Sequence, residues 1–240
     1  MRGRRAVLLL TLCGACACGR RPDPLPGTPR VFLWAWEHPE HLTFLDPHAA
    51  GVAFLARSVD WRGHDVTSTP RHQPLDVPPG TAMIAVVRLE AVAPPLPDAG
   101  TIVQEILTVE QLPRIVAVQI DFDARESERQ WYAGLLHELR GRLRPSIPLT
   151  ITALASWCLG DPWIRSLPVS DAVPMMFRMG GAGPREVGDY SLSVCRSSVG
   201  VSTDEIAPVV PRGRRLFIFH PGPWTASAYR DAMQLARRLR

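Results

Sequence analysis

The segment Asp121-Phe122-Asp123 combines the residue types and spacing that are best suited to chemistry in this sequence. It ends the apolar run 115–123, and side chains two residues apart on a strand point the same way. Both carboxylates are therefore expected on one face, where one keeps its proton while the other stays ionised. Such a pair suits acid/base cleavage of a glycosidic bond. It could also bind a divalent cation or form a structural network with Arg88 or Arg178.

Further charged and aromatic residues stand at the ends of other apolar runs. Asp204 and Glu205 are candidates for a second catalytic carboxylate, although acids at this position also cap helices. Tryptophan faces beside carboxylates suit sugar rings, whose C–H faces are apolar and whose hydroxyls bind charged acceptors. The substrate-binding candidates are Trp36, Glu37, Arg88, Trp157, Arg178 and Trp224. For the tryptophans, packing at the end of the fold is the alternative role.

The elements that must position these residues are eight short apolar runs with helical or turn segments between them. The predicted strands cover residues 31–36, 52–56, 82–89, 115–123, 149–154, 172–177, 199–202 and 215–219, and the predicted helices cover 101–112, 126–144 and 228–239. Buried strands that alternate with helices form parallel sheets with right-handed crossovers. Eight such strands in 240 residues predict an α/β fold, a TIM-like (β/α)8 barrel.

A barrel explains how the candidate residues could act together. In folds of this type the site lies at the carboxyl ends of the strands. All the candidates follow strand ends, so we expect them around one opening. Residues 57–79, between the second and third strands, are rich in Pro, Asp and His and predict a hairpin or a long loop in place of a helix.

The N-terminus carries the pattern of an exported protein. Arg2, Arg4 and Arg5 precede the apolar segment 6–12, which is too short for a stable membrane span. A basic start, a short apolar segment and small residues are typical of a signal peptide, which we place at residues 1–18.

The segment 12–16 resembles a lipobox, the bacterial signal for attaching lipid to a cysteine. Cys16 is therefore the expected lipidation site and Cys18 the alternative, while cleavage without lipid is the other option. Residues 19–29 are rich in Arg, Pro and Gly and predict a tether, and residues 30–240 form one predicted domain. The expected location is the periplasm or the outer membrane, with the lipid anchor as the contact to the membrane.

Two cysteines of the predicted domain, Cys158 and Cys195, could pair in an oxidising compartment. One follows a predicted strand and the other precedes one, which would place them at opposite barrel ends. A disulfide requires short Cα–Cα distances, so that placement would forbid the bond. The sequence leaves both outcomes open.

Composition argues against several functional classes. The formal net charge is +4, from 27 basic and 23 acidic residues, and every basic residue is arginine. The arginines form no stripe along one face, so we expect no nucleic-acid partner. The sequence has no zinc-ligand spacing, no serine nucleophile elbow and no phosphate-loop lysine, so we expect neither a metal nor a cofactor.

Four segments resemble a bacterial family, the domain of unknown function 3142. They are Gln119–Ala124 (QIDFDA), Thr152–Cys158 (TALASWC), Pro174–Gly180 (PMMFRMG) and Gly200–Glu205 (GVSTDE). The resemblance covers most of the chain after the predicted tether. It implies an exported, barrel-like protein and assigns no activity.

A more distant resemblance is to chitinase-type glycoside hydrolases, whose fourth strand carries Asp-x-x-Asp-x-Asp-x-Glu with the Glu as acid. Asp121 and Asp123 match the middle of that pattern. Val118 stands at the first Asp and Arg125 stands at the Glu. Phe177 replaces the Tyr of the sixth strand. The mechanism of that family therefore does not transfer to this chain.

Two functional hypotheses follow. In the first, a glycoside-hydrolase-like enzyme uses Asp121 or Asp123 as one carboxylate and Glu205, Asp204 or Glu37 as the other across the opening. In the second, a non-catalytic envelope lipoprotein binds a glycan or a protein partner, which the missing acid Glu favours. A rim so rich in charge is costly unless it is used, and this favours the enzyme.

Overall fold

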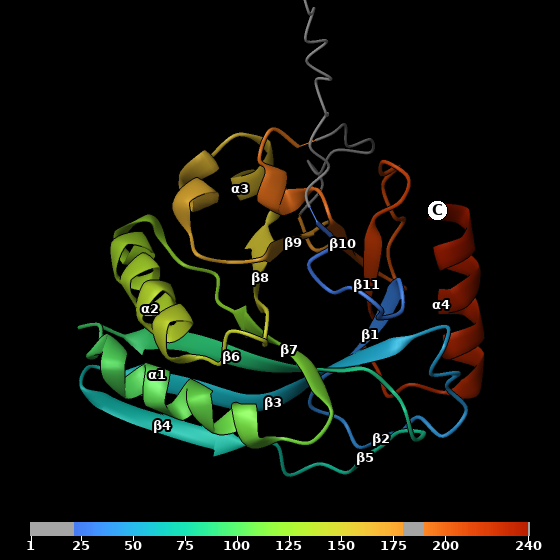
Figure 1. Ribbon diagram of the computed structural model, residues 1–240, viewed down its shortest axis with the longest axis horizontal. Coiled ribbons are helices and arrows are strands. Elements are labelled where there is room, and N and C mark those ends of the chain that lie inside the picture. The colour runs from blue at the N-terminus through green and yellow to red at the C-terminus, as the bar shows by residue number, and fades with distance from the viewer. Residues whose placement is uncertain (1–21, 180–189, 240) are drawn as a thin grey trace, which may run out of the picture.

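The computed structural model describes residues 22–179 and 190–239, and its centre is a closed barrel of parallel strands (Figure 1). Each strand of the barrel pairs with its neighbour along the chain, and the last pairs with the first. The barrel strands are β1 (Val31–Ala35), β3 (Gly51–Arg62), β6 (Met83–Ala93), β7 (Ile115–Asp121), β8 (Leu149–Leu154), β9 (Asp171–Met175), β10 (Ser198–Ser202) and β11 (Arg215–Phe219). All eight predicted runs form strands, and the TIM-like barrel is confirmed.

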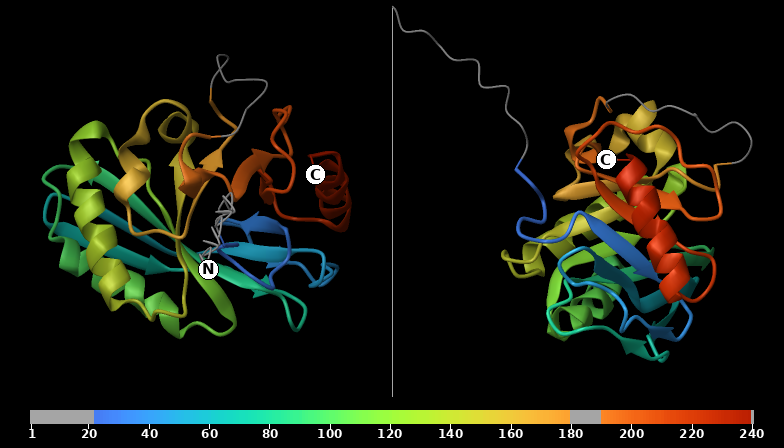
Figure 2. Two further views of the ribbon diagram at one scale, coloured as in Figure 1. Left: turned by 45° about the horizontal axis from the view of Figure 1, so that its top comes forward. Right: turned by 90° about the vertical axis from the view of Figure 1, so that its right-hand side faces the viewer.

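The helices are α1 (Ala99–Leu107) with η1 (Thr108–Gln111), η2 (Glu126–Glu128) with α2 (Arg129–Arg142), α3 (Ala155–Leu159), η3 (Pro162–Ser166), η5 (Ser193–Cys195) and α4 (Ala226–Leu239). The three predicted helices are present within about two residues of their predicted ends, and α3, η3 and η5 were not predicted. The Asp98 side chain caps α1 by accepting a hydrogen bond from the Thr101 N–H. Figures 1 and 2 show α1 and α2 on one flank of the barrel and α4 on the opposite flank.

The region between the second and third barrel strands is a hairpin. Strand β3 continues past the barrel and pairs in antiparallel fashion with β4 (Asp65–Pro70). Two short strands, β2 (Glu40–His41) and β5 (Leu75–Asp76), pair with each other outside the barrel. Of the two predicted alternatives for residues 57–79, the hairpin is therefore confirmed.

Two separate apolar clusters hold the fold together. One fills the inside of the barrel with side chains that alternate along the strands, among them Phe32, Trp34, Ile84 and Phe217. The other lies between the barrel and its helices, where α2 contributes Leu135, Leu136 and Leu139. This alternation explains why the strands read as continuous apolar runs, since both faces of each strand are buried.

The floor of the barrel, at the amino ends of the strands, is closed by residues 22–29. Leu25 is 1% exposed and packs into the inner cluster. Arg215 is fully buried and donates hydrogen bonds to the Asp23 carboxylate at 3.0 and 3.3 Å and to the Leu25 carbonyl at 2.9 Å. The described part of the segment predicted as a tether is thus in contact with the barrel. Cys16 and Cys18 lie outside the described residues.

Cys158 and Cys195 form a disulfide with a Cα–Cα distance of 5.9 Å. The expectation that they lie at opposite ends of the barrel is wrong. Helix α3 and η5, which carry the two cysteines, both contact strand β9, so the two cysteines meet beside that strand. The chain after β8 returns along the outside of the barrel, which the positions of the cysteines in the sequence did not reveal.

Candidate functional site

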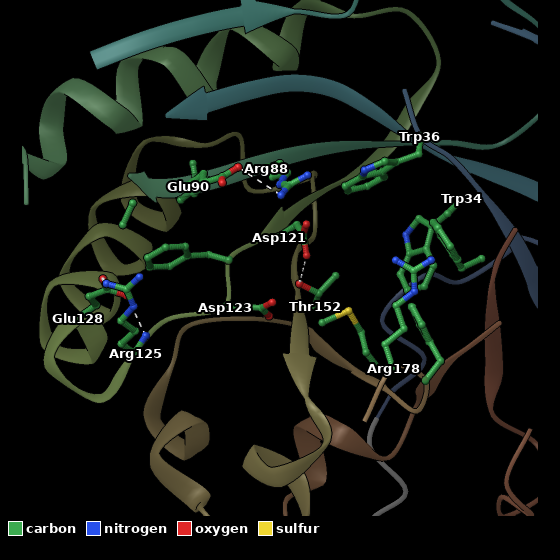
Figure 3. Close-up of a pocket in the computed structure, with 16 residues that line it drawn as sticks. Trp34, Trp36, Arg88, Glu90, Asp121, Asp123, Arg125, Glu128, Thr152 and Arg178 are labelled. Atoms are coloured by element: carbon green, nitrogen blue, oxygen red, sulfur yellow. Dashed lines mark hydrogen bonds and ion pairs between the residues drawn. The ribbon is translucent and has the colours of Figure 1, made fainter. Parts of the chain in front are cut away.

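A pocket of about 430 Å³ opens at the carboxyl ends of the barrel strands (Figure 3). Its lining combines acids, arginines and aromatic rings, as the strand ends predicted. The residues that line it are Trp34, Trp36, Arg88, Leu89, Glu90, Ala91, Asp121, Phe122, Asp123, Arg125, Glu128, Thr152, Met175, Phe177, Arg178 and Phe219. The floor segment, residues 22–29, closes the opposite end of the barrel, so the pocket is open only at the carboxyl ends of the described strands.

Asp121 and Asp123 form the acidic centre of the pocket. Asp121 is the last residue of β7 and is aligned with Arg88 of the neighbouring strand β6. On its other side, the Thr152 hydroxyl of β8 donates a hydrogen bond of 2.6 Å to the Asp121 carboxylate. Figure 3 shows Asp121 between Arg88 and Thr152, with Asp123 close by in the pocket wall.

The pocket wall changes the acidity of both aspartates. Burial raises the pKa of Asp121 from its ordinary value of 3.8 to about 6. The Thr152 hydrogen bond and Arg88 oppose this rise, whereas the charge of Asp123 adds to it. Loss of water also raises the pKa of Asp123, although part of its side chain is exposed, and Arg88 opposes this rise. Near pH 6, Asp121 can therefore give up or take a proton.

Ion pairs within the protein hold two arginines of the pocket. The Arg88 guanidinium lies 3.2 Å from the Glu90 carboxylate and 3.9 Å from that of Glu37. Arg125 pairs with Glu128 at 3.8 Å, and the Arg125 N–H donates a 2.8 Å hydrogen bond to the same carboxylate. Glu37, predicted as a substrate-binding residue, thus lies next to Arg88 but is not among the residues that line the pocket.

Aromatic rings line the side of the pocket near β1, β9 and β11. The rings of Phe177 and Phe219 stack with 5.6 Å between their centres, and Trp34 lies 6.0 Å from Phe177. The Trp34 indole N–H donates a 3.2 Å hydrogen bond to the Gln119 side chain inside the barrel. A Cβ atom at Gly200 would lie 2.9 Å from the Trp34 ring, so this position requires glycine.

Arg178 enters the pocket from the residues that follow β9. Its φ of 54° lies in the left-handed region, which costs a non-glycine residue roughly 1–2 kcal/mol. The Arg178 N–H donates to both carboxylate oxygens of Glu205, at 3.0 Å each. The guanidinium lies over the Phe219 ring, 5.0 Å from its centre. Glu205, predicted as a catalytic carboxylate, therefore supports Arg178 and does not line the pocket.

The structure corrects three further site predictions. Trp157 is 2% exposed and packs against Trp163 in the outer core, because the chain after β8 turns into α3. Trp224 is 4% exposed, and its indole N–H donates to the Trp34 carbonyl. Asp204 lies outside the lining, and a hydrogen bond from the Ser202 hydroxyl lowers its pKa. These residues do not face the pocket, whereas Trp36 does.

Several lining residues were not among the predicted site residues. Thr152 and Trp34 carry no signal of their own, because threonines and tryptophans also fill cores. The role of Thr152 follows from strand register, since Ile120 of β7 is aligned with Ile151 of β8 and the next residues are Asp121 and Thr152. Glu90 could have been found by its spacing, because it lies two residues after Arg88 on the same strand.

Within the described residues, no group of three or more His, Cys, Asp or Glu side chains is arranged to hold a metal ion. In the same part of the chain, none of the helices has the length and apolar character needed to cross a bilayer.

Comparison with known proteins adds one likeness. No family model matches the chain, and no curated protein matches it. Among solved structures, the chain is similar to the spore cortex-lytic enzyme SleL of Bacillus cereus, with 13% sequence identity and a TM-score of 0.44. The match covers 73% of this chain and 51% of that one, so the chain spans about half the length of SleL. No conclusion about activity follows, and membership of the domain of unknown function 3142 stays a prediction.

Proposed function

We propose that the pocket binds a carbohydrate and that the protein is a glycoside-hydrolase-like enzyme. The observation that carries this proposal is the pair Asp121 and Asp123 at the centre of a pocket lined by aromatic rings. Burial raises the pKa of Asp121 to about 6, which is the range in which a carboxylic acid can protonate a leaving group. Two carboxylates in different environments are what acid/base cleavage of a glycosidic bond requires.

In this proposal the two aspartates have different roles. Asp121 donates its proton to the glycosidic oxygen as the bond to the anomeric carbon breaks. Asp123 is exposed, and the charge of Arg88 opposes the rise in its pKa that burial causes. In this role its ionised carboxylate accepts a proton from the water that attacks the anomeric carbon. Exchange with solvent then returns both carboxyl groups to their starting states.

The aromatic side of the pocket would hold the sugar itself. Trp36 is half-buried, and Phe177 and Phe219 present a stacked pair of rings. The apolar C–H faces of a sugar ring pack against such surfaces, while its hydroxyls bind the carboxylates and arginines around them. An ion-paired group near the rim consists of Arg88, Glu90 and Glu37. It can bind the neutral hydroxyls of a sugar while its own ion pairs stay in place.

A non-catalytic binding protein is the second candidate, and one observation favours it. Arg125 occupies the position of the acid Glu of chitinase-type enzymes, and its side chain is paired with Glu128. In this alternative, the pocket of an envelope lipoprotein binds a glycan or a protein partner, and no bond is cleaved. Both candidates therefore use the same pocket, and they differ in whether a cleavage product is formed.

The test is a glycan array with the purified protein, followed by product analysis of every glycan that binds. The enzyme proposal predicts shortened products from the wild-type protein and none from Asp121→Asn or Asp123→Asn. Exposed Asp65 on β4, outside the pocket, provides the matched control Asp65→Asn, which should cleave normally. Saturable binding without product supports the second candidate, and an absence of glycan binding contradicts the carbohydrate site.

We also propose that the protein is exported and anchored to the envelope by a lipid on Cys16, with Cys18 as the alternative. The disulfide between Cys158 and Cys195 supports export, because structural disulfides persist in oxidising compartments such as the periplasm. The basic and apolar N-terminus supports it independently.

A further inference from the structure

The side chain of Arg178 differs from those of the other arginines that line the pocket. Arg88 and Arg125 are neutralised by Glu90, Glu37 and Glu128. Among the described residues, no carboxylate lies within 4.0 Å of the Arg178 guanidinium, which contacts the face of Phe219. With respect to residues 22–179 and 190–239, the exposed Arg178 guanidinium is thus unneutralised in the pocket, where it suits an anionic group.

The main chain of Arg178 is held in place at the edge of the pocket. Arg178 has a φ of 54°, and Glu205 accepts its N–H with both oxygens at 3.0 Å. Backbone conformations of this kind persist where the surroundings impose them, and they cluster at binding and catalytic sites. Asp204 is near enough for Arg178 to help lower its pKa, but its carboxylate is bound to the Ser202 hydroxyl. In the described part of the chain, Glu205 therefore holds the main chain of Arg178, Asp204 is bound to Ser202, and the guanidinium is left available.

The surroundings of Arg178 indicate the kind of molecule that carries the anion. Figure 3 shows Arg178 reaching towards Trp34, on the side of the pocket opposite Arg125 and Glu128. The guanidinium thus borders the aromatic surface on which a sugar ring would pack. An anionic group attached to that ring could contact Arg178 while the ring lies on the aromatic side chains.

We propose that Arg178 binds the carboxylate of an acidic sugar, so that the pocket selects glycans that contain carboxylate-bearing residues. The planar guanidinium matches a carboxylate with two parallel hydrogen bonds. A phosphate fits less well, because the pocket already holds the carboxyl groups of Asp121, Asp123, Glu90 and Glu128, which repel a dianion more strongly than a monoanion. The inference rests on the proposed carbohydrate site and names its substrate class.

The experiment compares matched ligands in calorimetric titrations of the full protein. The probes are oligosaccharides of galacturonate, of glucuronate and of N-acetylneuraminate, each beside its methyl ester, together with neutral oligosaccharides of glucose and N-acetylglucosamine. Methyl esterification removes the charge and changes the shape of the sugar little. We expect at least one acid to bind about tenfold or more tightly than its ester, as hydrogen bonds to charged groups imply.

Variants assign that preference to Arg178. Arg178→Gln should reduce the ratio of acid to ester affinity to about one, and Arg178→Lys should leave a smaller ratio than wild type, because lysine keeps the charge and loses the planar pair of donors. Arg237→Gln changes an exposed arginine of α4 outside the pocket and should leave the ratio unchanged. If Arg178→Gln does not fold, as judged by its thermal melt, Arg178→Lys decides, because a ratio equal to that of the wild type overturns the assignment to Arg178.

The outcomes separate this inference from the proposed function. Equal binding of acids and esters, or a preference that survives Arg178→Gln, overturns the inference. If neutral glycans bind and acidic glycans have no advantage, the carbohydrate site stands and the acidic-sugar inference falls. If no acidic or neutral glycan binds, the proposed function falls as well.

Discussion

Asp121 takes its properties from residues on two neighbouring strands. Arg88 of β6 and the Thr152 hydroxyl of β8 lie on either side of it, and Asp123 follows two residues later. The sequence predicted both aspartates on one face of a strand over residues 115–123. Both line the pocket, but β7 ends at Asp121 and Asp123 lies just beyond the strand. The flanking residues were less readable, since they depend on which positions of adjacent strands are aligned.

The acidity of Asp121 predicts a pH-dependent effect on stability. Its pKa is about 6 in the folded protein and close to 3.8 when unfolded, so the folded state binds more protons between these values. The free energy of unfolding therefore falls as pH rises from about 4 to about 6. The side chain of Asp121→Asn stays neutral at both pH values. Its free energy of unfolding should exceed that of the wild type by on the order of 1–2 kcal/mol at pH 7.5 and by little at pH 3.5.

Urea denaturation at both pH values measures this difference, with Asp65→Asn as the control that should show no such dependence. An equal stability difference between Asp121→Asn and wild type at pH 3.5 and 7.5 would contradict the burial of the carboxyl group. If the protein cleaves glycans with Asp121 as the acid, we expect the cleavage rate to decline above about pH 6, because Asp121 is then ionised and has no proton to donate.

The tryptophans show where residue type alone misleads. Trp36, Trp157 and Trp224 all follow predicted strands, yet only Trp36 of these three lines the pocket. Trp157 and Trp224 are buried, because the chain turns immediately after β8 and β11 and directs these side chains into the core. The direction of a side chain after a strand depends on the turn that follows, which the sequence pattern did not resolve.

At the scale of elements, the strands were the most predictable features. Each is buried on both faces and therefore reads as a short, continuous apolar run. The hairpin of β3 and β4 was one of two predicted alternatives, because residues 57–79 lacked a helical period but did not specify a pairing. The disulfide could not be predicted, since it depends on the path of α3 and η5 past β9.

The floor segment 22–29 is an element without regular structure, and its contacts predict a role in stability. A chain that starts at residue 30, the predicted domain boundary, lacks Asp23 and Leu25. Arg215 then keeps a buried charge without its carboxylate partner, and the inner cluster loses an apolar side chain. We expect this chain to be less stable than one that starts at residue 22, by at least about 2 kcal/mol.

Chemical denaturation of the two truncated chains measures this loss. Asp23→Asn in the longer chain separates the contribution of charge from that of Leu25, because it keeps the apolar contact. Equal stability of the chains that start at residues 22 and 30 would show that the floor segment contributes nothing to the domain.

At the scale of the whole molecule, the barrel has two different ends. The pocket lies at the carboxyl ends of the strands, and the floor segment closes the amino ends. The fold class follows from eight alternating strands, so the sequence predicted at which end of the barrel the pocket lies. The residues that meet there, including Glu205 as a support for Arg178, required the structure.

The proposed lipid anchor also belongs to this scale. We expect the mature protein to fractionate with membranes and to carry lipid at its first cysteine, measured by mass spectrometry of the N-terminal peptide. Cys16→Ser should abolish the modification, whereas Cys18→Ser should leave it in place if Cys16 is the site. A mature N-terminus without lipid on either cysteine would contradict the lipid anchor. It would not contradict export by a signal peptide, which is a separate proposal.

The attachment of Asp23 to Arg215 has a consequence for how an anchored molecule would be oriented. At no more than about 3.6 Å per residue, the chain from Cys16 to Asp23 spans at most about 25 Å. An acyl chain on Cys16 would therefore hold the closed end of the barrel near the lipid headgroups. The open end would point away from the membrane. Its acids and arginines would therefore contact polymers of the cell envelope and not the bilayer.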